Sequence, residues 1–374
     1  MSYQALYRTY RPKSFDEMVG QEHITKTLAN QVKTGDIGHA YLFVGSRGTG
    51  KTSSAKIFAR AINCLSPVNG SPCGKCEVCQ SFDSANNIDI LEIDAASNNG
   101  VDEARAIREK VKYPPINGKY KVFIIDEVHM LTDSAFNALL KTLEEPPPFV
   151  VFILATTEVH KIPATILSRC MRFDFKLVPA TVLANHLENI FSKASILSTK
   201  DATMAIALAG EGSVRDALSI ADCVSASSNK NITLEDVQRV IGSNDIESVL
   251  ALTEAILSGQ VGLGLEKVSS LASQGKNLSV VVKELCAHFR NLLVCQSCSN
   301  PEKIILVPNE TMSKLTEQSK KISKENLILL LQTFGSIEMQ MRSALSPEVL
   351  LETTVVAAAQ FISQGENFLS KKNG

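Results

Sequence analysis

"AYLFVGSRGTGKT", residues 40–52, joins a short apolar run to a glycine-rich segment that leads into a helical pattern. The run 40–44 is typical of a buried strand, and the motif GxxxxGKT follows it directly. This succession predicts a phosphate-binding loop, because its backbone N–H groups can surround phosphate oxygens. We expect Lys51 to contact the β- and γ-phosphates of a nucleotide and the Thr52 hydroxyl to bind Mg²⁺. The other loop residues expected to contact the nucleotide are Gly45, Ser46, Arg47, Gly48, Thr49 and Gly50.

A second apolar run, at 122–125, ends in the acids Asp126 and Glu127. We expect Asp126 to hold Mg²⁺ through water and Glu127 to polarise the water that attacks the nucleotide. Phosphoryl transfer requires both charge neutralisation and a positioned nucleophile. An acidic pair after a strand is often only a solvated strand end, but the phosphate-binding loop upstream favours the functional interpretation. His129, two residues further on, is expected to be structural.

Short β-rich runs alternate with helical patterns in the first half of the chain. Such alternation is typical of a parallel sheet with helices on its faces. The runs lie at 40–44, 88–94, 121–126, 150–155 and 171–176. After about residue 181 the strand pattern ends, and helical periodicity continues to about residue 364. We therefore predict three parts: an α/β domain at 1–179, a small helical domain at 180–242 and an all-α domain at 243–374.

The 374 residues carry a net charge of −1, with 38 basic and 39 acidic residues, so bulk charge does not indicate a general nucleic-acid binder. The sequence has no run of about 18 apolar residues that could span a membrane. Its N-terminal segment lacks the apolar core of a signal peptide. We therefore expect a cytoplasmic protein. Thiols stay reduced in that compartment, so clustered cysteines are expected to bind metal rather than to form disulfides.

Four of the nine cysteines lie within NCLSPVNGSPCGKCEVCQ, residues 63–80. Cys73, Cys76 and Cys79 are spaced by three around a glycine turn, and Cys64 can supply a fourth ligand. Four thiolates leave no open coordination position, so we expect a structural zinc in an insertion behind the phosphate-loop helix. A redox CxxC pair, which leaves the further cysteines unexplained, and a nucleic-acid knuckle remain alternatives. The cysteines expected to be small core residues are Cys170, Cys223, Cys286, Cys295 and Cys298.

Several motifs together resemble the AAA+ clamp-loader ATPases. They are YRPKSFDEMVGQEH, GSRGTGKT, EIDAASNNGVDEAR, IIDEVHML, NALLKTLEEPP and ILSRC. The cysteine spacing C-x8-C-x2-C-x2-C narrows the resemblance to the gamma/tau family of bacterial DNA polymerase III. The resemblance is close over residues 1–220, whereas beyond them only length and helical character agree.

The resemblance implies a DNA-dependent ATPase that uses ATP, Mg²⁺ and structural Zn²⁺ to load a sliding clamp onto primed DNA. It implies an AAA+ domain with a five-stranded parallel sheet and a zinc-module insertion at 64–79, then a helical lid and an all-α collar. The collar would join other clamp-loader subunits in a five-membered ring within the DNA polymerase III holoenzyme, a DNA-directed DNA polymerase (a nucleotidyltransferase). The family's longer tau form has a C-terminal extension that binds polymerase and helicase, and this chain is expected to lack those contacts.

The resemblance also implies roles for residues that look unremarkable in the sequence alone. Arg169 in ILSRC would act in trans, as an arginine finger on ATP bound by the neighbouring subunit. Thr157, otherwise a turn residue after a strand, would be sensor 1, and Arg215 would be sensor 2 at the γ-phosphate. The residues expected to line the adenine pocket are Tyr7, Arg11 and Val19.

Two other functions remain to be weighed against clamp loading. A branch-migration motor would use the same ATPase fold, but the cysteine insertion and the collar-like C-terminal part speak against it. A non-catalytic clamp-loader-like scaffold would not need the intact Lys51, Glu127 and Arg169. For DNA contacts, Ser97 and Asn98 are candidates, at a predicted helix start that would face phosphates.

Overall fold

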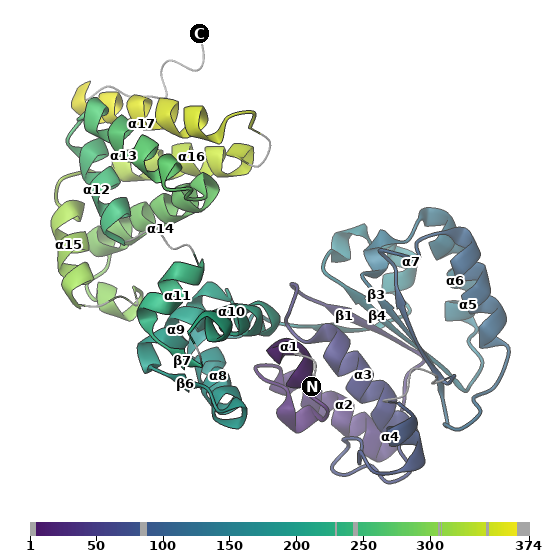
Figure 1. Ribbon diagram of the computed structural model, residues 1–374. Helices are drawn as coiled ribbons and strands as arrows, with labels where there is room; N and C mark the ends of the chain where they lie inside the picture. Colours follow the sequence, from purple (N-terminus) through teal and green to yellow (C-terminus); the bar gives the residue numbers. More distant parts are fainter. Residues whose placement is uncertain are drawn as a thin grey trace. The chain divides into compact units, whose positions relative to one another are not determined.

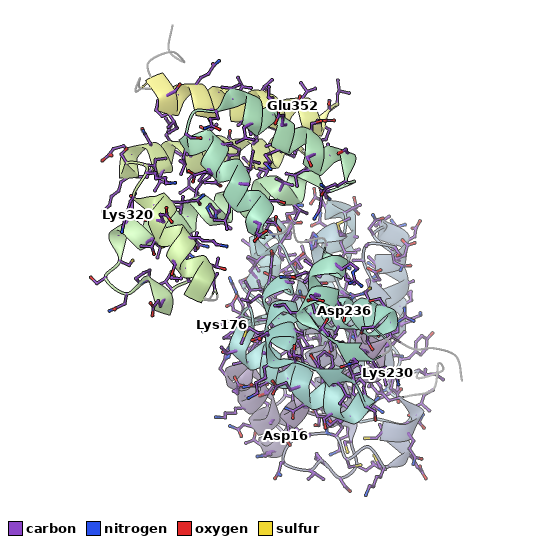
Figure 2. All side chains as sticks on the ribbon, turned by 60° about the vertical axis from the view of Figure 1, so that its left-hand side comes forward. Asp16, Lys176, Lys230, Asp236, Lys320 and Glu352 are labelled. Carbon is purple, nitrogen blue, oxygen red and sulfur yellow. The ribbon has the colours of Figure 1, made fainter. Side chains whose placement is uncertain are left out.

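The computed structural model describes residues 5–82, 88–228, 230–241, 246–305, 307, 309–341 and 344–364. The chain forms two compact units, Met1–Val237 and Gln238–Gly374 (Figure 1). The boundary predicted at 242/243 lies outside the described residues. Exposed charges of both signs lie on the surface, among them Asp16 and Lys176 in the first unit and Lys320 in the second (Figure 2). This mixture agrees with the nearly balanced net charge.

The first unit contains a five-stranded sheet in the order β2-β3-β4-β1-β5, and every neighbouring pair is parallel. The strands are β1 Ala40–Val44, β2 Ile90–Asp94, β3 Lys121–Asp126, β4 Val150–Thr156 and β5 Met171–Asp174. The sequence prediction of a five-stranded parallel sheet is confirmed. All residues of β1 and β4 are buried, because helices cover both faces of a parallel sheet. The carboxyl ends of β1, β3 and β4 meet at one edge, where ligands bind in such sheets.

Alternate side chains of the strands contact helices on opposite faces of the sheet. Tyr41 and Phe43 of β1 pack with the helices on one face, and Leu42 packs with those on the other. The first face is covered by η1 Phe15–Glu17, α2 Glu22–Thr34 and α3 Lys51–Asn63 (Figure 1). The second face is covered by α5 Val101–Val111, α6 Asp133–Glu144 and α7 Ala164–Leu167. The shorter elements of this region are α1 Leu6–Thr9, α4 Glu77–Ser81, η2 Val128–Met130 and η3 Val159–Lys161.

The remainder of the first unit is mainly helical. Its helices are α8 Ala180–Ala194, α9 Lys200–Ala209 and α10 Val214–Ser227, and α11 Leu234–Ile241 begins in this unit and continues past its last residue. Two short strands, β6 Leu197–Ser198 and β7 Asn231–Ile232, form a small parallel sheet that the sequence analysis did not predict. Two residues are too few to produce a visible alternation of apolar and polar positions.

The second unit is all-α within the part of the chain that the structure describes. Its helices are α12 Ile246–Leu257, α13 Val261–Ser273, α14 Leu278–Ser297, α15 Asn309–Ser319, α16 Lys324–Met341 and α17 Pro347–Gln364, with the 3-10 turn η4 Pro301–Lys303. The long helix α14 packs against α12, α15, α16 and α17. Phe289 of α14 and Phe334 of α16 are fully buried at the centre of this core, with ring centroids 5.3 Å apart. None of the helices in the described ranges is long and apolar enough to cross a membrane.

Candidate nucleotide site and cysteine cluster

The loop between β1 and α3 has the backbone geometry that a phosphate-binding loop requires. Gly45, Gly48 and Gly50 all have positive φ, at 153°, 74° and 103°, which side chains rarely tolerate. Helix α3 begins at Lys51, so the free N–H groups of its first turn point at the loop. The Lys51 ammonium donates to the carbonyl oxygens of Gly45, at 2.8 Å, and Ser46, at 3.0 Å. The loop and the lysine thus form one concave, positively charged cradle suited to phosphates.

Lys51 is buried beside the two acids that end β3. Burial lowers the pKa of the Lys51 ammonium, and the carboxylates of Glu127 and Asp126 oppose that shift. The Thr52 hydroxyl donates to Asp126 Oδ2 at 2.7 Å. A hydroxyl and a carboxylate oxygen at this distance are ligands of the kind that Mg²⁺ prefers, directly or through water. The positions of Thr52 and Asp126 are therefore compatible with the Mg²⁺ site predicted from the sequence.

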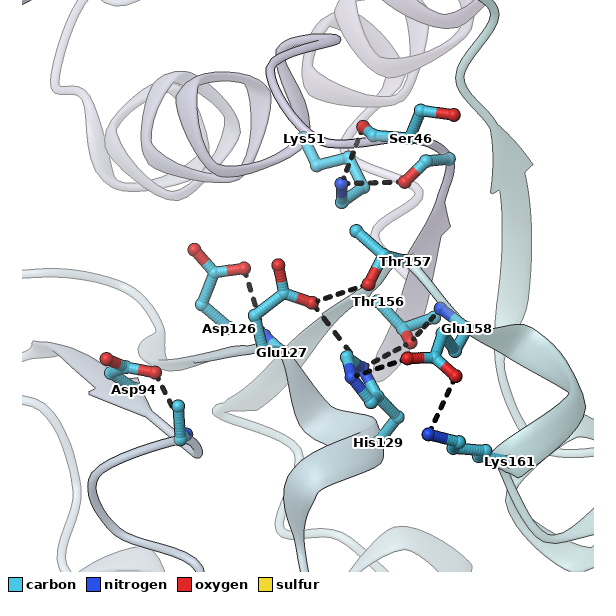
Figure 3. A network of polar contacts seen from close by, with 12 residues as sticks. Ser46, Lys51, Asp94, Asp126, Glu127, His129, Thr156, Thr157, Glu158 and Lys161 are labelled. Carbon is cyan, nitrogen blue, oxygen red and sulfur yellow. Dashed lines mark hydrogen bonds and ion pairs between the residues drawn. The ribbon is translucent and has the colours of Figure 1, made fainter. Parts of the chain in front are cut away.

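Glu127 follows Asp126 in a left-handed conformation, with φ of 47°. The Thr157 hydroxyl donates to Glu127 Oε2 at 3.1 Å, and His129 Nδ1 lies 3.4 Å from the same oxygen (Figure 3). Asp126 Oδ1 also accepts from the Glu127 N–H at 3.0 Å. The ends of β3 and β4 therefore bring Glu127 and Thr157 together, 30 residues apart in the sequence.

A cavity of about 470 Å³ opens at this edge of the sheet, within the first unit. Of the residues predicted to bind or act on a nucleotide, those that line it are Tyr7, Arg11, Val19, Arg47, Gly48, Thr49, Gly50, Lys51, Thr52, Asp126, Glu127 and Arg215. Thr157 reaches the cavity only through its hydrogen bond to Glu127. The volume suits a ligand of nucleotide size.

Helix α10 closes one side of the cavity through direct contact with the phosphate-binding loop. The Val214 N–H donates to the Gly48 carbonyl at 3.1 Å. The Arg215 guanidinium carbon lies 5.4 Å from the centroid of the Tyr7 ring, within the range of a cation–π contact. Arg11 Nε donates to Ser53 Oγ at 3.1 Å. Nine further residues line the cavity without having been predicted from the sequence: Arg8, Tyr10, Pro12, Glu17, Met18, Ser53, His186, Val214 and Leu218.

Gln21 is a further residue that sequence analysis did not single out. Its side chain is fully buried. Its Nε2 donates to Lys176 O at 2.7 Å and to Thr49 O at 3.4 Å, and its Oε1 accepts from the Lys176 N–H at 3.2 Å. Gln21 thus connects the chain after β5 to the phosphate-binding loop. In the sequence, Gln21 stands out only by its position within the motif YRPKSFDEMVGQEH.

Arg169 lies outside the cavity of its own chain. Its Nη2 forms an ion pair with Glu144 Oε1 at 2.8 Å, and its Nη1 donates to the Thr165 carbonyl at 2.6 Å. Both partners come from the helices that precede it, α6 and α7. The guanidinium is therefore held at the surface, one third exposed, rather than directed at its own phosphate-binding loop.

The candidate DNA contacts Ser97 and Asn98 lie in a turn and not at a helix start. Ser97 Oγ donates to Asp94 Oδ2 at 3.3 Å, and Asn98 Nδ2 donates to the Asp94 carbonyl at 3.0 Å. Helix α5 begins only at Val101. The predicted helix start was thus placed too early, because Asp94 forms an Asx-type turn with the residues that follow it.

The four clustered cysteines converge between α3 and α4, and their sulfurs all lie within 4.8 Å of one another. The Cys64–Cys76 and Cys73–Cys79 pairs are each 3.9 Å apart. Tetrahedral zinc with Zn–S bonds of ~2.3 Å requires sulfurs about 3.8 Å apart. Backbone N–H groups of Lys75 and Cys76 lower the pKa of the Cys73 thiol to about 6, whereas burial raises that of Cys79. The cluster fits a structural zinc site.

The prediction that the remaining cysteines are small core residues is confirmed only in part: Cys170, Cys286 and Cys295 pack against the hydrophobic cores. Cys223 is exposed on α10, and the others are only partly buried. A small sulfur-bearing side chain tolerates the rim of a helical core as well as its centre. No role follows for these residues.

Three family models match the chain. "DNA polymerase III, delta subunit" matches residues 20–179, "DNA polymerase III clamp loader subunit, ATPase lid domain" matches 182–230, and "DNA polymerase III subunits gamma and tau domain III" matches 232–367. A solved structure, the Thermotoga maritima RuvB Holliday junction branch migration motor, is 18% identical with a TM-score of 0.47, covering 72% of this chain and 86% of that one.

Curated relatives match at higher identity. DNA polymerase III subunit tau of Bacillus subtilis is 42% identical over 96% of this chain and 64% of its own length. DNA polymerase III subunit gamma/tau of Mycoplasma pneumoniae is 44% identical over 76% of this chain and 42% of its own length. The chain thus spans roughly half of the length of these relatives. The matches extend over nearly all of the sequence, from the ATPase motifs to the last helices, and the chain belongs to the gamma/tau family of DNA polymerase III subunits.

Proposed function

We propose that this chain is an ATP-driven motor subunit of a bacterial clamp loader, which hydrolyses ATP to place a sliding clamp on primed DNA. The observation that carries the proposal is one cavity that gathers Lys51, Thr52, Asp126, Glu127 and Arg215 in a chain of the gamma/tau family. The relatives named as polymerase III subunits support a replicative function. The match of the gamma and tau model to 232–367 supports it over a branch-migration motor.

The geometry of the cavity divides the work of ATP hydrolysis among its residues. The loop N–H groups and Lys51 would bind the phosphates, and Thr52 with Asp126 would hold Mg²⁺, which would neutralise phosphate charge. Glu127 orients and polarises the attacking water, with Thr157 fixing one oxygen of its carboxylate. Arg215, carried by α10, would contact the γ-phosphate from the lid. The complete set of these groups supports an active subunit over a non-catalytic scaffold.

The adenine base would lie among Tyr7, Arg11 and Val19, which line the cavity beside the phosphate-binding loop. The cysteine insertion would hold one structural zinc and take no part in hydrolysis. The division into an ATPase domain at 1–179, a lid at 180–242 and a collar at 243–374 is supported by the separate family-model matches.

We further propose that the chain works in the cytoplasm, in a five-membered ring with other clamp-loader subunits. Its partners would be the sliding clamp and primer–template DNA. The nucleotidyl transfer of the DNA polymerase III holoenzyme would belong to the assembly, whereas the chemistry of this chain would be ATP hydrolysis. Arg169, held away from its own cavity by Glu144, would complete the site of the neighbouring subunit.

The trans role of Arg169 provides the test of this function. An arginine acting in trans on a phosphoryl group is worth about 10³–10⁵ in rate, or roughly 4–7 kcal/mol in the barrier. Arg169→Ala should therefore bind ATP normally and hydrolyse it poorly in the assembled, DNA-stimulated complex. Glu127→Gln should also bind ATP without hydrolysis. The matched control is Arg172→Ala, which removes an exposed arginine whose ion pair is with Asp174, outside the cavity.

Mixing the two inactive variants sharpens the test. A Glu127→Gln neighbour still carries Arg169 and can complete the intact site of an Arg169→Ala chain. Partial recovery of ATP hydrolysis in mixed assemblies is the expected result. Mixed assemblies that form, as judged by mass, but stay as inactive as either parent would refute the trans assignment.

A further inference from the structure

His129 is a buried polar side chain for which the proposed mechanism has no use. Only 6% of it is exposed, although it follows Glu127 by two residues. Its Nδ1 lies 3.1 Å from Thr156 Oγ1 and 3.4 Å from Glu127 Oε2. Its Nε2 lies 3.5 Å from Glu158 Oε1. The imidazole is therefore in contact with three side chains, two of which are carboxylates (Figure 3).

The contacts of His129 anchor it to the segment that follows β4. Thr156 Oγ1 accepts from the Glu158 N–H at 3.0 Å, which fixes the threonine beside the ring. Glu158 is itself held by Lys161, at 2.7 Å, and lies 3.6 Å from the exposed His160. The Nδ1 side of His129 thus faces an oxygen whose position is set by the backbone.

Glu127 is held on one oxygen only. Thr157 and His129 both approach Oε2, one from the chain after β4 and the other from η2. Within the described residues, no hydrogen bond or ion pair reaches Oε1. Two contacts from different directions restrict rotation of the carboxylate, whereas one would leave it free to turn. The unheld oxygen is then available to a water molecule in the cavity that Glu127 lines.

We propose that His129 is a positioning residue, which together with Thr157 holds the Glu127 carboxylate in the orientation that activates the attacking water. The inference rests on the proposed role of Glu127 as the water-orienting group. In this proposal, the contact that matters for hydrolysis is the one between His129 Nδ1 and the Glu127 carboxylate. The Nε2 side, facing Glu158, serves to hold the ring. A carboxylate displaced by about 1 Å can cost about 100-fold in rate, so the loss of this contact should appear in kcat.

Two substitutions of similar size separate the two sides of the ring. In His129→Asn the amide nitrogen can take the place of Nδ1, and in His129→Gln it can take the place of Nε2. We expect His129→Asn to keep kcat within about threefold of wild type and His129→Gln to lower it by about 10- to 100-fold. Both should leave the Kd for ATP unchanged, because His129 does not line the cavity. The matched control is His160→Gln, which removes an exposed histidine near the same Glu158 and should have no effect.

The measurement is steady-state ATP hydrolysis by the full chain, assembled with the other subunits and primed DNA, together with nucleotide titration and thermal unfolding. In single-turnover reactions, His129→Gln should add no loss to Glu127→Gln, since residues that act as a unit are not additive. Equal kcat values for His129→Asn and His129→Gln, or failure of both to fold, would overturn the proposal. If Glu127→Gln hydrolyses ATP at the wild-type rate, the proposed function of Glu127 fails. If Glu127→Gln is inactive and His129→Gln is fully active, only the inference about His129 fails.

Discussion

Gly48 of the phosphate-binding loop lies against the start of α10, and Gly48→Ala should weaken the first unit more than a simple change of backbone preference would. A Cβ atom at this position would lie 1.9 Å from Ser213 Oγ, 3.1 Å from Ser213 Cβ and 3.2 Å from Arg215 Cβ. The first distance is impossible, so the Ser213 side chain would have to rotate. That hydroxyl caps α10 by accepting from the Asp216 N–H at 3.2 Å, and rotation would break the cap.

Two costs add up in this variant. Gly48 has φ of +74°, and an alanine in the left-handed region costs about 1–2 kcal/mol. Loss of a serine N-cap costs about 1 kcal/mol. The free energy of unfolding of the first unit should therefore fall by roughly 2–3 kcal/mol. Gly35→Ala is the matched control, because Gly35 has φ of +77° and a Cβ there would meet nothing within 4 Å. That variant should carry only the backbone cost of about 1–2 kcal/mol.

Urea unfolding of the two variants and the wild-type chain, followed by circular dichroism, measures the difference. ATP titration of the same samples should show weaker binding for Gly48→Ala alone, because Arg215 sits two residues beyond the displaced Ser213. Equal losses of stability in Gly48→Ala and Gly35→Ala would refute the clash. Unchanged ATP affinity in Gly48→Ala would refute the coupling between α10 and the phosphate-binding loop.

Three further outcomes follow from the described contacts. Lys51→Ala should abolish tight ATP binding. Near-normal affinity in a nucleotide titration would show that Lys51 is not needed to bind the phosphates. The purified chain should contain one zinc ion. Cys76→Ser should lose the zinc and unfold the insertion but not the surrounding domain, because metal binding is coupled to local folding. Zinc-free protein with free thiols, prepared without chelator, would contradict the zinc site. Asp89→Ala should lower the free energy of unfolding by roughly 2–4 kcal/mol. The reason is that the buried Asp89 carboxylate accepts hydrogen bonds from three backbone N–H groups, at residues 116–118. A loss below about 1 kcal/mol in urea unfolding would show that water replaces the carboxylate.

The features that the sequence determined are those that depend on residues close together along the chain. The phosphate-binding loop needs a strand, glycines at fixed positions and a lysine, all within 40–52, and the structure has each of them in that order. The five strands follow from short apolar runs, and the start of α6 follows from Thr132, whose hydroxyl accepts from the Ala135 N–H. The cysteine cluster also falls in this class, because three of its members span only 73–79.

Tertiary structure alone decided how distant segments complete the site. The contact of Ser213 and Arg215 with Gly48 and Tyr7 joins parts of the chain that no periodicity relates. The sequence did not indicate the surroundings of His129, because a single histidine after a strand looks the same in the sequence whether its side chain faces a core or a carboxylate. Its contacts with Thr156 and Glu158 depend on the register of β3 and β4, which places the turns that follow both strands against each other. Local motifs are dictated by backbone conformation and hydrogen bonding within a few residues, whereas these contacts exist only after the sheet and its helices have packed, because burial of the common core brings their segments together.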